Sequence, residues 1–375
     1  KKALPKFEGM FAFAWLNHEE EVWVARDAFG RCPLHVASDG ETWYFASEIK
    51  ALAAIGMAGR TMAVPAGDAW RLHPSPAKRV TWTALPDPVL TADSAVVAAG
   101  KVKRLLDEGT KARMLADVPI CTLLSGGLDS TLITAILAKY NPNITAFHAV
   151  FNEDSADLRA ARVAAKHIGV RLVEVHIDPL QLDDISNTIW AVETGSKVQV
   201  EIALACIPLA KAIRAHGFKA VFSGDGSDEL WGSYGFSQMK GRNLTDIGWA
   251  RYRTALFLDQ QRRNFIRANK AYMHHGIEVR IPFTHRPLVE YALSLPKAVI
   301  ATHLDLRHND GRERRSMKAV LEAAAEGLLP TELIYRPKLA FQVGTGLREE
   351  AARVCGAYGF KASAYYKDEY TRLFG

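Results

Sequence analysis

The sequence predicts an α/β fold, with a parallel sheet covered by helices and a smaller β-rich part in front of it. Strand-like and helix-like segments alternate from residue 119 to residue 224, whereas the first 52 residues contain short aromatic and β-branched runs broken by turn residues. The 375 residues are 49% hydrophobic, which is enough to build two domains that each bury a core.

The β-rich part consists of four runs, "GMFAFAW", "EEVWVARD", "LHVASDG" and "TWYFASEIKAL", separated by Asn17, Gly30, Asp39 and Gly40. This pattern is typical of antiparallel strands joined by turns. Five prolines with little sustained periodicity follow between residues 65 and 88. We therefore expect a boundary between residues 80 and 95, and divide the chain into a first domain, 1–88, and a second, 89–375.

A helix is predicted over residues 91–115, with Thr91 or Asp93 available to cap it. The alternating units come next. Strands are expected at 119–124, 144–151, 170–177 and 219–224, and helices at 130–140, 155–168, 179–192 and 200–216. Such alternation favours a parallel sheet whose ligands bind at the carboxyl ends of its strands.

Charge and cysteine content exclude several classes of protein. Basic residues exceed acidic ones by 47 − 41 = 6 and are scattered, so no basic stripe predicts a nucleic-acid partner. Cys32, Cys121, Cys206 and Cys355 form no CxxC pair, which argues against a zinc site and a disulfide framework. No apolar run approaches the roughly 18 residues of a membrane span, and the start lacks a signal-peptide pattern, so we expect a cytoplasmic protein without membrane contacts.

The stretch "LLSGGLDST", residues 123–131, lies between a predicted strand and a predicted helix. Its adjacent glycines allow a tight turn and close backbone approach to a ligand, and the helix dipole favours a phosphate there. An ordinary turn between strand and helix would need no such polar groups. Ser125, Asp129 and Ser130 add groups suited to an anion and a metal ion.

A second stretch, "SGDGSDELWGSY" at residues 223–234, also follows a predicted strand. Alone it would be interpreted as a solvated acidic loop. Beside the first stretch, at the same edge of one sheet, it forms the second wall of a nucleotide site. Asp129 and Asp228 are then the two carboxylates that we assign to Mg²⁺.

These motifs carry a family resemblance. "LLSGGLDS" resembles the pyrophosphate-binding loop of the ATP-pyrophosphatases, an adenine nucleotide alpha-hydrolase-like fold. With "FSGDGSDELWGSY", "ANKAYMHHGIEVRIPF" and "YRPKLAFQVG", it resembles the synthetase domain of the glutamine-hydrolysing asparagine synthetase family, in the same order. The first 85 residues are similar to the second half of that family's class II glutaminase domain, which is an α+β fold.

The resemblance implies an enzyme of asparagine biosynthesis that uses ATP and Mg²⁺. ATP converts a carboxylate into an acyl-adenylate with release of pyrophosphate, and an amine or ammonia then displaces AMP to form an amide. By the same resemblance, Lys338 stabilises charge in the transition states, and the site binding ATP and pyrophosphate comprises Leu124, Ser125, Gly126, Gly127, Leu128, Asp129, Ser130, Val150, Ser223, Gly224 and Lys318. A homodimer is a further expectation. A surface lysine is the alternative for Lys338, and Arg336 could serve the phosphates instead.

Two acidic residues help to decide whether the chain resembles the amide-forming or the β-lactam-forming members of the family. The resemblance places Glu278 near the acyl site, although Glu278 and Arg280 could also form a structural ion pair. In relatives that close β-lactam rings, a tyrosine occupies the position of Asp225, so the aspartate favours the amide-forming branch and makes Asp225 a catalytic candidate. Asparagine synthetases usually carry the longer glutamate there.

The chain departs from the family in two ways. The family's glutaminase uses an amino-terminal cysteine, and this sequence starts with Lys1, so use of glutamine is expected only where a complete glutaminase domain exists. Residues 193–208, "ETGSKVQVEIALACIP", contain Lys197 and Glu201 but no arginine suited to hold a small dicarboxylate. Aspartate is therefore only the default acyl donor.

Three alternatives remain beside the ligase. One is a biosynthetic enzyme that forms an amide or β-lactam on a larger metabolite. Another is an ATP-binding partner subunit without catalysis, against which Ser125, Asp129, Asp228 and Lys338 argue. The third is tRNA modification, which the scattered charge disfavours.

Overall fold

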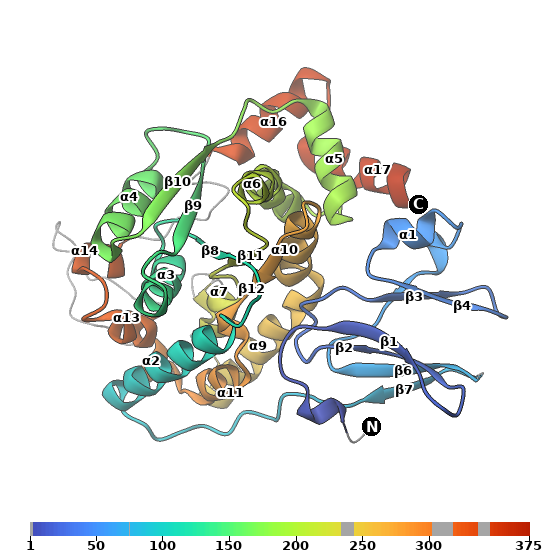
Figure 1. The fold of residues 1–375 in the computed structure, drawn as a ribbon, viewed down its shortest axis with the longest axis horizontal. Coiled ribbons are helices and arrows are strands. Elements are labelled where there is room, and N and C mark those ends of the chain that lie inside the picture. Colours follow the sequence, from blue (N-terminus) through green and yellow to red (C-terminus); the bar gives the residue numbers. More distant parts are fainter. Residues whose placement is uncertain (1–2, 75, 234–243, 302–317, 337–345) are drawn as a thin grey trace.

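A computed structural model describes residues 3–74, 76–233, 244–301, 318–336 and 346–375, which form three sheets with helices around the largest (Figure 1). The largest sheet has five strands in the order β10-β9-β8-β11-β12, and every neighbouring pair is parallel. These strands are β8 (Ile120–Leu123), β9 (Thr145–Val150), β10 (Arg171–His176), β11 (Ala220–Phe222) and β12 (Glu278–Arg280). The predicted α/β fold is confirmed.

The central strand β8 is the point where the strand order reverses. From β8 the chain moves outward to β9 and β10, and it then returns to place β11 and β12 on the other side of β8. Helices α3 (Leu128–Tyr140) and α4 (Ala156–Ile168) follow the outward path, and α6 (Lys197–Ala215) lies on the return path across the sheet (Figure 1). Ligands of open α/β sheets bind at such a reversal, outside the carboxyl ends of the strands.

The helix in front of the sheet, α2 (Ala95–Ala112), lies within the predicted range 91–115. The sequence predicts Thr91 or Asp93 as the cap of this helix, but the cap is Ser94. The Ser94 hydroxyl accepts the N–H group three residues further on, at 3.4 Å. Thr91 instead accepts the N–H of Asp93 at 3.3 Å, so its hydroxyl closes a turn before the helix.

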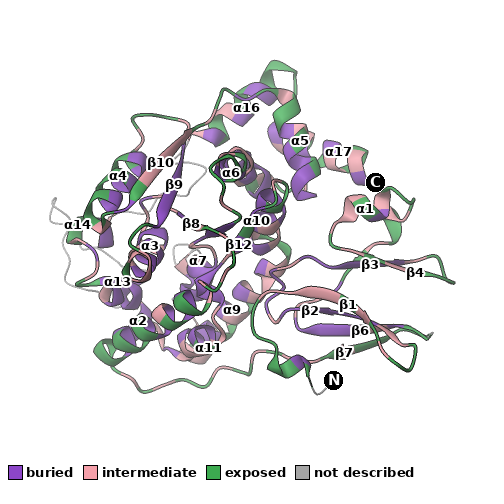
Figure 2. Cartoon of the chain, in the orientation of Figure 1, coloured by how far each residue is buried: buried purple, intermediate pink, exposed green. Residues whose placement is uncertain are grey.

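The remaining helices surround the sheet and enclose one large apolar core (Figure 2). They are α5 (Leu182–Val192), α7 (Ser227–Trp231), α9 (Asp246–Asp259), α10 (Asn264–Met273), α11 (Arg286–Ser294), α12 (Lys297–Ile300), α13 (Ala319–Ala325), α14 (Thr331–Ile334), α16 (Leu347–Ala357) and α17 (Ala362–Phe374). Phe147, Phe222 and Trp231 are fully buried in this core. Among the described residues, no helix combines the length and apolar character needed to cross a membrane.

The amino-terminal part contains two antiparallel sheets, ordered β1-β2-β6-β7 and β4-β3-β5. Its elements are β1 (Ala12–Leu16), β2 (Val22–Arg26), β3 (His35–Ser38), β4 (Trp43–Ala46), α1 (Ile49–Ala53), β5 (Met62–Ala63), β6 (Asp68–His73) and β7 (Lys78–Thr81). The predicted antiparallel strands are confirmed for the first three runs and for the start of the fourth, whose end forms helix α1 instead. The sequence analysis missed β6 and β7 inside the proline-rich segment, because charged residues interrupt the apolar pattern of both strands and prolines lie close to their ends. The division at residues 88 and 89 stays a prediction.

Buried polar contacts join the amino-terminal sheets to the helical part. Arg31 donates from Nη1 to the hydroxyl of Thr284 at 2.8 Å. Arg26 donates from Nη2 to the carbonyl of Gln261 at 3.1 Å, and the Gln261 side chain accepts the N–H of Ala66 at 2.7 Å. Both arginine side chains are almost completely shielded from solvent. The position of the helical part relative to the sheets is therefore fixed by directional hydrogen bonds.

Glu193 makes a further link between the amino-terminal part and the helical part. It ends α5 with a left-handed backbone, at φ 54°, and its carboxylate accepts the N–H groups of Ile49 and Lys50 at 2.9 and 2.8 Å. The same carboxylate forms an ion pair with Lys270 on α10, and at most 2% of either side chain is exposed. Because backbone N–H donors favour the ionised carboxylate, we take the pair as charged at neutral pH.

We expect Lys270→Met to destabilise the fold by about 3–5 kcal/mol, since it leaves the buried Glu193 carboxylate without its counter-charge. Urea unfolding at neutral pH measures this loss. A Glu193→Gln, Lys270→Met double variant should recover part of it, because no unpaired charge then remains. A single Lys270→Met variant as stable as the parent would contradict the assignment.

The pair also predicts a dependence of stability on pH. Burial raises the pKa of Glu193, but the charge and hydrogen bond of Lys270 and the two N–H groups lower it more, so the net pKa lies below its usual value. A lowered pKa in the folded state contributes stability above the usual glutamate pKa, and this contribution is lost as the pH falls through the folded-state value. The stability difference between the parent and Glu193→Gln should therefore shrink in acid.

Candidate functional site

The first wall of the candidate site is the loop that leaves β8. Leu124 is buried and donates its N–H to the carbonyl of Phe147 on β9 at 2.9 Å. Gly126 then adopts a left-handed backbone, at φ +75°, and a Cβ there would lie 2.7 Å from the backbone nitrogen of Ala161. Only glycine fits this position, because any side chain would meet both strain and the backbone of α4.

Hydroxyl groups hold this loop in shape. The hydroxyls of Ser125 and Ser130 are 2.9 Å apart, and the Ser130 hydroxyl also accepts the N–H of Ser125 at 3.1 Å. Thr131 donates to the carbonyl of Gly127 at 2.7 Å. The N–H groups in the first turn of a helix have no partner within it, and the helix dipole is positive there. The start of α3 is therefore suited to an anion at the carboxyl edge of β8.

The second wall is the loop that leaves β11, the neighbour of β8. Ser223 donates its hydroxyl to Asp225 at 2.6 Å and accepts the N–H of Asp225 at 3.2 Å. A Cβ on Gly224 would lie 3.0 Å from the nitrogen of Ser130 and 3.1 Å from the Cβ of Asp129. The two loops that the sequence singled out are therefore in direct contact, at the point where the strand order reverses.

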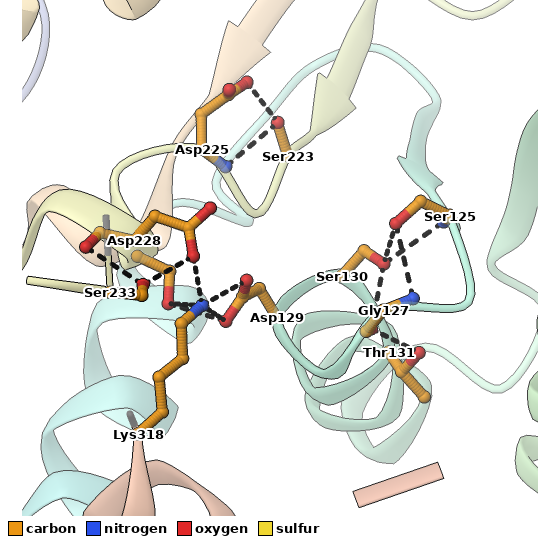
Figure 3. Close-up of polar contacts among 11 residues, drawn as sticks. Ser125, Gly127, Asp129, Ser130, Thr131, Ser223, Asp225, Asp228, Ser233 and Lys318 are labelled. Atoms are coloured by element: carbon orange, nitrogen blue, oxygen red, sulfur yellow. Dashed lines mark hydrogen bonds and ion pairs between the residues drawn. The ribbon is translucent and has the colours of Figure 1, made fainter. Parts of the chain in front are cut away.

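Asp129 and Asp228 converge between the two loops on the ammonium group of Lys318 (Figure 3). The Nζ atom lies 2.7 and 2.6 Å from the two oxygens of Asp129 and 2.6 Å from Oδ1 of Asp228. Hydroxyl donors orient both carboxylates: Ser227 donates to Asp129 at 2.7 Å, and Ser233 donates to Asp228 at 2.9 Å. Residues far apart in the sequence thus form one compact charged cluster.

Lys318 stays protonated in this cluster. Burial lowers its pKa, but the charges of Asp129 and Asp228 and their hydrogen bonds raise it more, so the net pKa lies above its usual value.

The positions of Asp129 and Asp228 show whether a divalent ion fits between the two loops. Both carboxylates face one point, and carboxylate oxygens are the ligands that Mg²⁺ prefers. The two residues therefore fit the expected metal.

The other predicted binding residues lie near the same sheet edge. Val150 ends β9 and is buried, and Leu128 opens α3. Lys338 lies outside the described residues. Arg336, two residues before it in the sequence, donates to the carbonyl of Gly126 at 3.2 Å and pairs with Asp157 at 2.5 Å. Its guanidinium group thus supports the first loop.

Glu278 is not brought to the site. It is the first residue of β12 and lies level with Ala220, at the amino end of β11, whereas both loops leave from the carboxyl ends. Its carboxylate pairs with Arg280 at 2.7 Å, and 49% of its side chain is exposed. In this structure Glu278 occupies the ion pair that the sequence left open as its alternative role.

Sequence reasoning missed the arginine beside the site. Arg267 on α10 donates from Nη2 to Asp225 at 2.9 Å and from Nη1 to the side chain of Gln199 on α6 at 3.2 Å. Asn264, one turn earlier on α10, accepts from Arg267 at 3.0 Å. The sequence signal that could have found Arg267 is its three-residue spacing from Asn264, which puts both side chains on one face of a helix. Glu201 instead pairs with Lys197 on its own helix.

A cavity of about 520 Å³ lies elsewhere, on the amino-terminal sheet β1-β2-β6-β7. Its lining includes Trp15, Trp23, Arg71 and Trp82. None of the predicted site residues lines it. The chemistry of the two loops, rather than this cavity, therefore identifies the candidate site.

Both the amino-terminal part and the helical part of the chain match profiles of known protein families. The asparagine synthase family profile matches residues 101–268 and 248–373, and the profile of a glutamine amidotransferase domain matches residues 1–54. Asparagine synthetase B [glutamine-hydrolyzing] of Escherichia coli K12 is 30% identical over 373 residues, covering 93% of this chain and 64% of the relative. Asparagine synthetase [glutamine-hydrolyzing] 3 of Arabidopsis thaliana is 29% identical over 356 residues, covering 90% of this chain and 59% of the relative.

Solved structures give a weaker likeness. The NH3-dependent NAD synthetase of Campylobacter jejuni matches with a TM-score of 0.28 and 17% identity, over 40% of this chain and 63% of that one. The NMN synthetase of Francisella tularensis matches with a TM-score of 0.27 and 13% identity, over 66% and 98%. These scores are too low to support an argument about fold or function.

The sequence matches agree with the geometry of the two loops. The chain spans 64% and 59% of the lengths of the two asparagine synthetases compared above. The family profile matches residues on both sides of the candidate site, including β8, β11 and Lys318. The chain therefore belongs to the asparagine synthase family.

Proposed function

We propose that this chain is an ATP-dependent, amide-forming ligase. It activates a carboxylate as the acyl-adenylate with release of pyrophosphate, and ammonia or another amine then forms the amide with release of AMP. The observation that carries this proposal is the convergence of Asp129 and Asp228 between the two loops, in a chain of the asparagine synthase family. The loops meet where an α/β sheet binds its ligands.

The first loop supplies the pyrophosphate site. Backbone N–H groups from Gly126 to Asp129 hold the phosphate oxygens, whereas the N–H of Ser125 donates to the Ser130 hydroxyl, and the hydroxyls of Ser125 and Ser130 fix the shape of the loop. Leu124, Val150, Ser223 and Gly224 lie at or just beyond the carboxyl ends of neighbouring strands, where the nucleoside binds. Adenylation follows when the substrate carboxylate is held in line with the α-phosphate and water is excluded.

Asp129 and Asp228 would hold Mg²⁺ together with phosphate oxygens. When bound, the ion supplies positive charge that stabilises the pyrophosphate leaving group. Lys318 would add a positive charge at the same phosphates.

The acyl site lies on the side of Asp225. Ser223 and Arg267 hold its carboxylate from two directions, at 2.6 and 2.9 Å. Asp225 is therefore a preorganised acceptor for a donor group on the incoming substrate. Aspartate is the default acyl donor and ammonia the default amine. Glutamine as the nitrogen source, a cytoplasmic location and a homodimer stay predictions.

Pyrophosphate exchange into ATP tests the proposal. With labelled pyrophosphate and Mg²⁺, we expect exchange to depend on a carboxylic acid, with L-aspartate first in a panel of amino acids. With ammonia added, AMP and pyrophosphate should appear in equal amounts with the amide. Release of ADP and phosphate in place of AMP and pyrophosphate would contradict the proposal. Pyrophosphate exchange that is the same with and without every carboxylic acid in the panel would also contradict it.

We expect Lys338→Ala to lower turnover by about 10² to 10³, the range for losing one preorganised charge, with a much smaller change in the KM for ATP. Initial rates at saturating ATP measure the effect. Lys367→Ala, on an exposed lysine of α17, is the matched control and should keep the parent rate. A large rise in the KM for ATP at unchanged turnover would make Lys338 a ground-state phosphate contact instead.

A further inference from the structure

We propose that Lys318 is the built-in counter-cation of the carboxylate pair and exchanges places with the divalent ion when nucleotide binds. Free Mg²⁺ is thereby kept out of the site until phosphate groups draw the ammonium group away from Asp129 and Asp228. This inference rests on the proposed function, because it assumes that the carboxylate pair receives a metal–nucleotide complex.

Geometry makes the two cations mutually exclusive. The Nζ atom contacts both oxygens of Asp129 and one of Asp228 within 2.7 Å. A Mg²⁺ ion bridging the same carboxylates would lie about 2.0–2.1 Å from their oxygens. It would therefore occupy nearly the same point as the ammonium nitrogen. One cation has to leave before the other enters.

The charge of Lys318 also opposes binding of a divalent ion while its ammonium group contacts the carboxylate pair. Asp129 and Asp228 together carry two negative charges, and the protonated Lys318 neutralises one of them. Only 8% of the Lys318 side chain is exposed, so water screens its charge weakly. A divalent ion approaching the occupied pair meets a repelling charge within a few ångströms. Free metal binds weakly as long as the ammonium group stays.

The attachment of Lys318 allows the exchange. Its backbone is anchored at the start of α13, where its carbonyl accepts the N–H groups of Leu321 and Glu322 at 2.9 Å each. The side chain beyond this anchor is a flexible four-carbon stem that ends in a point charge, suited to phosphate as well as to carboxylate. The tip can therefore move from the carboxylates to phosphate oxygens while the helix stays in place.

Metal binding without nucleotide tests the first half of the exchange. We expect Lys318→Met to bind free Mn²⁺, measured by electron paramagnetic resonance, at least about tenfold more tightly than the parent, as expected for removal of one charge at close range. Lys318→Arg keeps the charge and should bind Mn²⁺ as weakly as the parent. Lys318→Met combined with Asp228→Asn should lose the gain. Equal or weaker Mn²⁺ binding by folded Lys318→Met would overturn the proposal.

Nucleotide binding without metal tests the second half. In the presence of a chelator, Lys318→Met should bind ATP about tenfold more weakly than the parent, because the phosphates lose the ammonium group. Opposite changes for Mn²⁺ and ATP distinguish exchange from a merely structural role, which would weaken both. Thermal melts show whether each variant is folded, and Lys318→Gln replaces Lys318→Met if the latter is not. Neither assay uses turnover, so failure of the ligase proposal would appear separately, in pyrophosphate exchange.

Discussion

Asp129→Asn and Asp228→Asn should each lower ATP–pyrophosphate exchange by about 10³-fold, since each removes a charge worth several kcal/mol at the phosphates. Asparagine keeps the shape of the side chain and can still accept from Ser227 or Ser233, so the loops should hold their positions. Asp129 lies in the first turn of α3 and Asp228 in the first turn of α7, and neither belongs to the apolar core, so we expect the fold to remain intact. Initial exchange rates at saturating ATP, with circular dichroism of each variant, measure the effect.

A matched control separates the carboxylate pair from acidic residues in general. Asp154 lies on the exposed loop after β9, so Asp154→Asn removes one carboxylate at the same edge of the sheet but away from the pair. It should keep the parent exchange rate. Exchange within about threefold of the parent in both Asp129→Asn and Asp228→Asn would refute the metal assignment, since loss of about 0.6 kcal/mol is too little for a metal ligand.

The 375-residue chain should form the amide from ammonia but not from glutamine, and it should release no glutamate from glutamine with or without ATP. Glutamine hydrolysis of the resembled kind needs an activated thiolate. Burial raises the pKa of Cys32 to about 12 and that of Cys206 to about 11. Burial also raises the pKa of the Cys121 and Cys355 thiols. All four thiols are therefore protonated at neutral pH.

Amide formation with ammonium chloride or glutamine, beside a coupled assay for glutamate, measures this difference. Ammonia-dependent synthesis serves as the positive control, because it reports on the adenylating site alone. Glutamate release that a thiol reagent abolishes would overturn the prediction. Single serine replacements of Cys32, Cys121, Cys206 and Cys355 would then locate the nucleophile.

Sequence reasoning reached most of the α/β sheet because its signals are local. The strands from β8 to β11 lie in segments rich in aliphatic residues that alternate with helix-like segments, and such patterns can be recognised in the sequence alone. The β6–β7 hairpin lacked this signal, since charged residues interrupt both strands and prolines lie close to their ends. The cap of α2 was misassigned for a related reason: Thr91, Asp93 and Ser94 all suit a cap, and only the backbone path selects Ser94.

The sequence alone determined the chemistry of the two loops: the glycines that let them turn and touch, and the carboxylates and hydroxyls that they carry. Both loops follow strands, so their place at one sheet edge was also predictable. The family resemblance had placed Lys318 in the nucleotide site, but only the tertiary structure decided which side chains the distant residues contact there. It brings Lys318 onto Asp129 and Asp228 and brings Arg267 onto Asp225, but it leaves Glu278 at the other end of β12. Helix packing and strand direction set these contacts, and they depend on the whole core rather than on any local pattern.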